Sequence, residues 1–158
     1  MKKILFPFLV LSSFLVAADF ACVDTNRIVR ESKFITKAQQ ELKRELEKYQ
    51  QMIVQKQREM EDLKKALESK VLSENARKKK MEELEKLEED LRKLQVEAQT
   101  KLSRKKAELE KLVFDRIINI VKEKAKAEKL KAVFDCNTML YTDKLIDITE
   151  EVLRELDK

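Results

Sequence analysis

The sequence predicts a mainly α-helical protein with a small β body, in which a long antiparallel coiled-coil hairpin projects from a short-stranded sheet. Three observations lead to this fold class. Charged residues make up 41% of the 158 residues, and the chain has no glycine and one proline, so long helices can continue without interruption. Apolar residues recur every three or four positions through the middle of the chain. The aromatic residues gather near its two ends, where a small core can form.

Residues 1–18 have the pattern of a secretory signal peptide. Lys2 and Lys3 precede an apolar stretch, and small residues stand where signal peptidase cleaves, just before Asp19. The apolar stretch is shorter than the roughly 20 residues that a membrane-spanning helix needs. We therefore expect cleavage after Ala18 and an exported mature chain, with an uncleaved anchor as the alternative.

The missing residue types exclude most enzyme chemistry. Without glycine there is no glycine-rich phosphate loop, and without histidine there is no imidazole base and no ordinary zinc site. We therefore expect a binding or scaffolding protein that is not an enzyme, with no catalytic residue, cofactor or metal. Removal of the two signal-peptide lysines lowers the formal net charge from +5 to +3, and the interleaved charges indicate solvated helix faces rather than a nucleic-acid-binding surface.

Two runs of regularly spaced apolar residues predict a helical hairpin arm over residues 34–114. Only about two positions in seven are apolar, so each helix can bury one narrow seam against one neighbour. The break between the runs predicts a tip near residues 69–76, where Ser73 followed by Glu74 resembles a helix N-cap. A single continuous helix is the alternative. The predicted seam positions are Ile35, Ala38, Leu42, Leu46, Tyr49, Ile53, Met60, Leu63 and Leu67, followed by Leu84, Leu87, Leu91, Leu94, Ala98, Leu102, Leu109 and Leu112.

Three features of the arm lead to further expectations. The apolar pattern is interrupted near Lys56 and Lys105, which suggests bending points. Met52, Met60 and Met81 are expected at the seam, with adaptable contacts to a partner as the alternative. The densest basic run predicts a surface that contacts an acidic partner or an anion, against the alternative of a solvated helix face. This basic surface consists of Lys70, Arg77, Lys78, Lys79 and Lys80.

The two ends of the chain, residues 19–33 and 115–158, are predicted to form one β-containing body, because a hairpin brings them together. Residues 147–156 have the pattern of a short helix in which Asp147 and Glu150 show capping-box spacing. The strands of the body are expected at residues 20–23, 130–135 and 138–141.

Three short strands give a thin core and exposed sheet edges, so the body is predicted to associate with further copies through its strands. Cys22 and Cys136 stand in or beside these strands, and the sequence is compatible with either a disulfide or two buried free thiols. The residues assigned to the association surface are Phe20, Cys22, Val23, Val133, Phe134 and Tyr141.

Several short motifs then make the sequence resemble a known family. Phe-Ala-Cys-Val-Asp at residues 20–24 follows the signal, and Leu-Ser-Glu-Asn-Ala-Arg stands at the tip, residues 72–77. Ala-Val-Phe-Asp-Cys-Asn at residues 132–137 leads to Tyr141 and then to Asp-Ile-Thr at residues 147–149. With these motifs the chain resembles the Skp/OmpH family of periplasmic chaperones along essentially the whole mature length.

The resemblance implies a periplasmic homotrimer whose strands form a central β body and whose three arms enclose a cavity. It implies an ATP-independent holdase that binds unfolded outer-membrane proteins there and prevents their aggregation. Cys22 and Cys136 are not hallmarks of that family. Two alternatives remain open: a structural coiled-coil protein of the envelope, and a polyanion binder that recognises lipopolysaccharide or anionic lipid. Nucleic acid is not expected as a partner, because it conflicts with the export signal.

Overall fold

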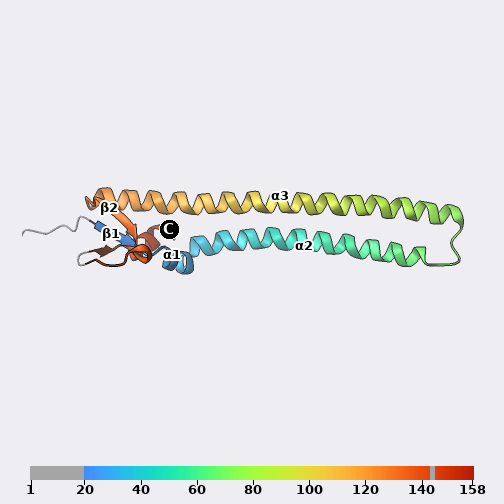
Figure 1. Cartoon of the computed structure of the whole chain (residues 1–158), viewed down its shortest axis with the longest axis horizontal. Coiled ribbons are helices and arrows are strands. Elements are labelled where there is room, and N and C mark those ends of the chain that lie inside the picture. The colour runs from blue at the N-terminus through green and yellow to red at the C-terminus, as the bar shows by residue number, and fades with distance from the viewer. Residues whose placement is uncertain (1–19, 143–144) are drawn as a thin grey trace, which may run out of the picture.

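A computed structural model describes residues 20–142 and 145–158, and the predicted signal peptide lies outside these residues. The molecule is a long two-helix arm with a small body at one end (Figure 1). This confirms the predicted fold class of a mainly helical protein with a small sheet. In chain order the elements are β1 (Phe20–Val23), α1 (Thr25–Glu31), α2 (Lys33–Leu67), α3 (Glu74–Ala127), β2 (Ala132–Asp135), the 3-10 turn η1 (Cys136–Thr138), β3 (Ile146–Asp147) and α4 (Thr149–Leu156).

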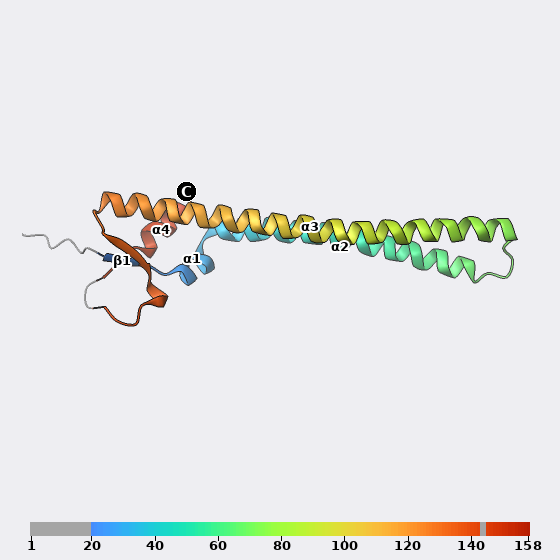
Figure 2. The same ribbon diagram turned by 45° about the horizontal axis from the view of Figure 1, so that its top comes forward.

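The arm consists of α2 and α3, which lie side by side and antiparallel (Figures 1 and 2). They contain 35 and 54 residues, which at a rise of 1.5 Å per residue corresponds to about 50 and 80 Å. The chain reverses between Leu67 and Glu74. Ser73 is the N-cap of α3, and its hydroxyl oxygen accepts a hydrogen bond from the backbone N–H of Ala76 (3.3 Å). A serine at this position satisfies one of the free amide donors of the first helical turn.

The seam of the arm is buried most deeply around Tyr49, Leu94 and Ala98. Ile53 and Leu102 pack against this cluster and are partly buried. The expectation that Met52 and Met81 lie at the seam is wrong, since they are 41% and 51% exposed. The reason is the narrowness of the seam, because a two-helix arm covers only the side chains that point directly at the partner helix. Leu46 and Leu112, also predicted at the seam, are 41% and 52% exposed.

The helix α1 is an element that the sequence patterns did not reveal. The carboxylate of Asp24 accepts a hydrogen bond from the backbone N–H of Arg27 (2.9 Å) and caps this helix. Ser32 then has an extended backbone (φ −69°, ψ 127°), which separates α1 from α2, and its side chain caps α2 through the N–H of Ile35. Asp24 therefore caps α1 and Ser32 caps α2, and the extended backbone at Ser32 separates the helix of the body from the helix of the arm.

The body is built on a three-stranded parallel sheet with the order β2-β1-β3. Parallel neighbours need a long crossover, and here the whole arm connects β1 to β2. Cys22 lies opposite Phe134 of β2 and Asp147 of β3. Helix α4 packs against β1, α1 and the C-terminal part of α3, as Figure 2 shows. The buried core residues are Ala21, Val23, Ile28, Ile35, Ile148, Val152, Leu153 and Leu156.

Two predictions about the C-terminal part of the body are wrong. Residues 138–141 do not form a strand: Leu140 and Tyr141 are 103% and 84% exposed, and the third strand is Ile146–Asp147. That short strand is held beside β1, where the N–H of Ile148 donates to the carbonyl oxygen of Cys22 (3.0 Å). Asp147 is also not the N-cap residue of α4, because that position is Ile148. Its carboxylate instead accepts a hydrogen bond from the backbone N–H of Thr149, the first residue of the helix (2.9 Å).

Candidate functional site

The exposed face of the body carries aromatic side chains from neighbouring strands. Phe20 of β1 and Phe134 of β2 are 43% and 48% exposed, and their ring centroids lie 6.2 Å apart. Tyr141 and Ile146 add exposed apolar surface in the segment after β2. The Phe20–Phe134 pair is an exposed apolar contact of the kind typical of an interaction surface. We call Phe20, Phe134 and Tyr141 the aromatic surface of the body.

The other residues that the sequence assigned to self-association lie inside the protomer or beside its core. Cys22 and Val23 are 5% and 4% exposed. Val133 is partly buried and packs against the main core cluster. Because strands alternate their side chains between two faces, Ala21 and Val23 point into the main core, while Phe20 and Cys22 share the opposite face. On that face Cys22 is covered and Phe20 stays exposed. A short strand therefore supplies both the core and the exposed surface.

A disulfide joins Cys22 to Cys136, with the two Cα atoms 5.0 Å apart. Beside it, Asp135 accepts hydrogen bonds from the hydroxyl of Thr25 and from the N–H of Asn137, and these hold the pKa of Asp135 below its usual value. The side-chain amide of Asn137 donates to Asp24 (2.8 Å) and is the main reason that the pKa of Asp24 is also lowered. Both acids are thus structural anions that fasten η1 to α1.

The disulfide also bears on metal binding. In the described part of the chain, one group of potential ligands has its atoms within 4.8 Å of one another: Cys22, Cys136 and Asp147. Since the two sulfur atoms are bonded to each other, neither is available as a thiolate ligand. A single carboxylate is not a metal site, so we assign no metal to these residues. Over residues 20–142 and 145–158, none of the helices has the length and apolar content needed to cross a bilayer.

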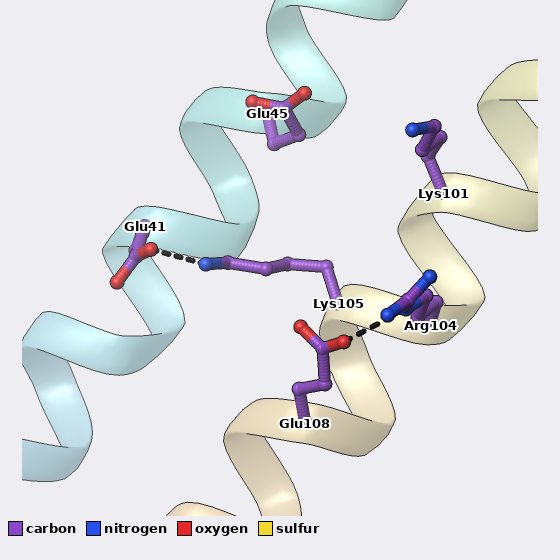
Figure 3. Close-up of a pocket in the computed structure, with 6 residues that line it drawn as sticks. All are labelled: Glu41, Glu45, Lys101, Arg104, Lys105 and Glu108. Atoms are coloured by element: carbon purple, nitrogen blue, oxygen red, sulfur yellow. Dashed lines mark hydrogen bonds and ion pairs between the residues drawn. The ribbon is translucent and has the colours of Figure 1, made fainter.

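The lysines that interrupt the apolar seam form ion pairs across the arm. Lys105 of α3 reaches Glu41 of α2 (2.5 Å), and Figure 3 shows its side chain extended between the two helices. The Glu41 carboxylate raises the pKa of Lys105 above its usual value. Lys56 of α2 pairs with Asp90 of α3 (3.7 Å). Both helices continue through these positions, so the interruptions are polar layers within a regular arm.

The recess around Lys105 is lined only by charged side chains. Glu41, Glu45 and Glu108 supply carboxylates, and Lys101, Arg104 and Lys105 supply cations, so the two signs balance (Figure 3). Arg104 pairs with Glu108 on its own helix (2.8 Å). A recess whose charges largely neutralise one another is better suited to joining two helices than to holding a charged ligand.

At the tip, the five residues of the basic surface have different surroundings. The guanidinium of Arg77 donates to the carbonyl oxygens of Leu67 (2.6 Å) and Ser69 (3.0 Å), so it closes the turn by capping the end of α2. Lys70, Lys78 and Lys79 are exposed, and Lys80 is partly buried. The solvent-facing cations of the tip are therefore three lysines, while Arg77 holds the turn together.

One face of α3 carries exposed residues that the sequence patterns did not identify as functional. Val96 and Phe114 are 61% and 63% exposed. They are eighteen residues apart, which is five helical turns, so they lie on the same face, and Val96 points away from the seam residue Leu94. Thr100, Ser103 and Ala107 lie on this side of the helix between them, together with one charged residue, Glu110. We define the outer face of α3 by its uncharged members Val96, Thr100, Ser103, Ala107 and Phe114.

Comparisons with known proteins agree with this architecture. The sequence model of a family described as outer membrane protein (OmpH-like) matches residues 19–156. A protein from Aquifex aeolicus (strain VF5), named only as an uncharacterized protein, is 64% identical over 158 residues, which span 100% of this chain and 98% of that protein. The crystal structure of a candidate outer membrane chaperone (OmpH-like) from Caulobacter crescentus CB15 has a TM-score of 0.75 at 15% identity, covering 99% of this chain and 89% of that chain, and therefore shares its fold. The chain belongs to the OmpH-like outer membrane protein family.

Proposed function

We propose that the protein is an ATP-independent periplasmic holdase, a homotrimer that binds unfolded outer-membrane proteins between its arms and prevents their aggregation. Membership of the OmpH-like family supports a chaperone role, and the description of the Caulobacter crescentus protein points the same way. The residues that would do this work are surface side chains rather than a catalytic group. The protein is accordingly proposed to act by binding alone, without enzymatic turnover.

The observation that carries the proposal is the outer face of α3. Glu110 is the one charged residue among its five uncharged ones, in a chain of which 41% of residues are charged, and Val96 and Phe114 expose more than half of their surface. An unfolded β-barrel precursor alternates apolar and polar residues, and such segments aggregate in water. Weak apolar contacts along a helix can accept many such sequences, because they require no fixed pairing.

Two exposed methionines give the arm further apolar surface. Met52 on α2 and Met81 on α3 are 41% and 51% exposed. The thioether side chain is flexible and polarizable, so it can repack against differently shaped partners. Charged residues surround these side chains and keep the empty arm soluble. A client held on such a surface stays unfolded, because the chaperone binds the unfolded state and lowers its free concentration by mass action.

Self-association through the body would place several arms around one space. The aromatic surface of the body is exposed in the single chain, and β2 and β3 are edge strands with unpaired outer sides. Exposed edges and aromatic side chains together favour pairing with another copy. Three copies joined at the body, with arms projecting in one direction, would enclose a cavity lined by arm faces.

The tip provides a second proposed contact. Lys70, Lys78 and Lys79 are exposed and lie at the end of the arm that is farthest from the body. Lysine side chains at such a position attract acidic segments of a client, or anionic lipid and lipopolysaccharide at a membrane surface. These contacts would weaken as salt rises, whereas contacts with the outer face of α3 would not.

An aggregation assay tests the proposal. A porin unfolded in urea is diluted into buffer with and without excess protein, and light scattering is followed over time. We expect scattering to be suppressed without ATP, and the suppression to persist at high salt because the main contacts are apolar. Unchanged scattering at excess protein would contradict the holdase role and favour a purely structural role in the envelope. Suppression that disappears at high salt would instead favour a polyanion-type contact through the tip.

A further inference from the structure

The disulfide joins the central strand of the sheet to the segment that follows β2. Cys22 is in the central strand β1 and is 5% exposed, while Cys136 is the first residue after β2. The two cysteines are separated by 114 residues, so the bond connects the start of the mature chain to the segment that follows the entire arm. A crosslink over such a long loop removes much of the conformational freedom of the unfolded chain.

Few other interactions hold β2 and η1 in place. β2 has four residues at the edge of the sheet, none of them fully buried, and Phe134 points to solvent. Its non-covalent ties to the rest of the body include a four-residue ladder with β1, the hydrogen bond from Thr25 to Asp135, and that from Asn137 to Asp24. Val133 packs against the core but is only partly buried, and a four-residue edge strand with no fully buried side chain is weakly held. The disulfide therefore contributes a large share of what fixes this segment.

The same segment carries most of the aromatic surface of the body. Phe134 lies two residues before Cys136 and Tyr141 five residues after it. Phe20 lies two residues before Cys22, and its ring is next to that of Phe134. The disulfide thus holds side chains from both ends of the chain in one arrangement. A surface that is fixed before binding loses less conformational entropy when another copy packs against it.

We propose that self-association of the chain depends on the Cys22–Cys136 disulfide, so that assembly is confined to an oxidising compartment. This inference rests on the proposed function, in which copies associate through the body. A newly made chain in a reducing compartment keeps both thiols. It then has a helical arm but a loosely held β2, and it stays dissociated. Oxidation after export fixes β2 and completes the surface for assembly.

A disulfide in a second protein can oxidise the two cysteines of the chain. A thiolate of the chain attacks one sulfur of a protein disulfide in a thiol oxidase and forms a mixed disulfide. The second cysteine then attacks the sulfur of the first and releases the oxidase as a dithiol. The chain loses two electrons and two protons, and the oxidase disulfide takes up both. A dithiol reductant reverses the exchange through the same intermediate.

The test compares oxidised and reduced mature chain. Both are refolded from urea, one without reductant and one with excess dithiothreitol, and sedimentation velocity is measured over a range of concentrations. We expect association of the reduced chain to be weaker by about tenfold or more. The arm should keep its helical circular dichroism in both samples, because its seam around Tyr49, Leu94 and Ala98 is separate from the body core.

The double variant Cys22→Ala/Cys136→Ala is the matched control. We expect it to associate as weakly as the reduced chain and to be unaffected by dithiothreitol. Equal association of oxidised and reduced chain would overturn the inference, and so would loss of the arm helices on reduction, since the effect would then be general unfolding. An oxidised chain that is itself monomeric would contradict the proposed trimer instead, so the two failures are distinguishable.

Discussion

Asp157, next to the C-terminal residue, accepts a hydrogen bond from the hydroxyl group of Ser32 at the beginning of α2 (2.7 Å). Its carboxylate also accepts from the backbone N–H groups of Lys33 and Phe34, both at 3.0 Å. Ser32 and Asp157 are 125 residues apart in the chain. The end of α4 therefore supplies an anion to the N-terminus of α2, where the free amide groups and the helix dipole favour negative charge. This contact ties the arm to the body.

Loss of the Asp157 carboxylate should weaken the contact between the arm and the body. We expect Asp157→Ala to lower the free energy of unfolding by about 1 kcal/mol, the usual cost of losing a helix cap. Asp157→Asn should cost less, because the amide oxygen can still accept a hydrogen bond. Urea unfolding followed by circular dichroism gives both values, and equal stability of wild type and Asp157→Ala would show that the contact is not stabilising.

The same contact predicts a pH dependence. Burial raises the pKa of Asp157, but hydrogen bonds from Lys33, Phe34 and Ser32 outweigh it, so the net pKa lies below the usual value. A group with a depressed folded-state pKa stabilises the fold above its unfolded pKa of about 3.9, and this stabilisation is lost as the pH falls through the lower folded value. The stability difference between wild type and Asp157→Asn should thus be present at neutral pH and vanish in strong acid. A difference that grows with acidification would have the wrong sign.

The ion pairs across the arm share one register with a tyrosine contact. Lys105 pairs with Glu41, the Tyr49 hydroxyl donates to Glu97 (3.4 Å), and Lys56 pairs with Asp90. From the first contact to the second, α2 advances eight residues (Glu41 to Tyr49) and α3 goes back eight (Lys105 to Glu97). From the second contact to the third, each helix moves seven residues, to Lys56 on α2 and to Asp90 on α3. Seam lysines with acidic partners can thus select the register of the hairpin, as polar seam residues do in coiled coils.

Charge reversal tests the register pairs. Lys105→Glu would face the carboxylates of Glu41, Glu45 and Glu108, so we expect the melting temperature to fall by roughly a few degrees. The exchanged pair Glu41→Lys/Lys105→Glu should recover part of that loss, and the recovery should shrink at high salt. Additive effects of the two changes, with no recovery in the double variant, would show that the pair does not couple the helices.

The two hydrogen bonds from the Arg77 guanidinium at the tip lead to another prediction. Because one guanidinium serves the carbonyl oxygens of both Leu67 and Ser69, neither Arg77→Ala nor Arg77→Lys can reproduce both bonds. We expect amide hydrogen exchange in the last turn of α2 to accelerate roughly fivefold to tenfold, equivalent to about 1 kcal/mol. Lys78→Ala is the matched control in the same turn of α3, and it should leave that exchange unchanged. Equal acceleration in both variants would assign the effect to lost charge rather than to the cap.

The outer face of α3 can be tested without disturbing the seam. Val96→Ser and Phe114→Ser remove exposed apolar surface, so we expect little change in stability but a several-fold weaker retention of an unfolded porin. Retention is measured by the light-scattering assay at matched concentration. Gln50→Ser, an exposed polar position on α2, serves as the control. Undiminished retention by the Val96→Ser/Phe114→Ser double variant would exclude this face as the client contact.

The parts of the fold that depend on local patterns could be predicted from the sequence. The spacing of leucines along the arm indicates two paired helices, and Ser73 marks the start of the second one. The strand beginning at Phe20 could also be predicted, since it is a short apolar run after the predicted signal peptide. These features have signals that are local in the sequence: the spacing of apolar residues, a cap residue and a short apolar run.

The remaining parts depend on contacts between distant segments. Residues 138–141 have strand propensity, but β1 pairs instead with Ile146–Asp147, which is docked through Thr149: the hydroxyl of Thr149 accepts from the N–H of Asp24 (2.8 Å). Phe114 is an aromatic residue at the boundary of the predicted arm and body, yet it is 63% exposed on the same face of α3 as Val96. The partners of Asp157 could not be read from the sequence, because they depend on where α4 docks.

The mass of the native particle tests the central claim most directly. Native mass spectrometry of the mature, oxidised protein alone and after mixing with a urea-unfolded porin gives the subunit number and the client stoichiometry together. The proposed function predicts three chains in the free particle and a complex in which one trimer has gained one porin chain. A monomer that gains no porin would contradict it, because a single arm encloses no space in which to hold an unfolded protein.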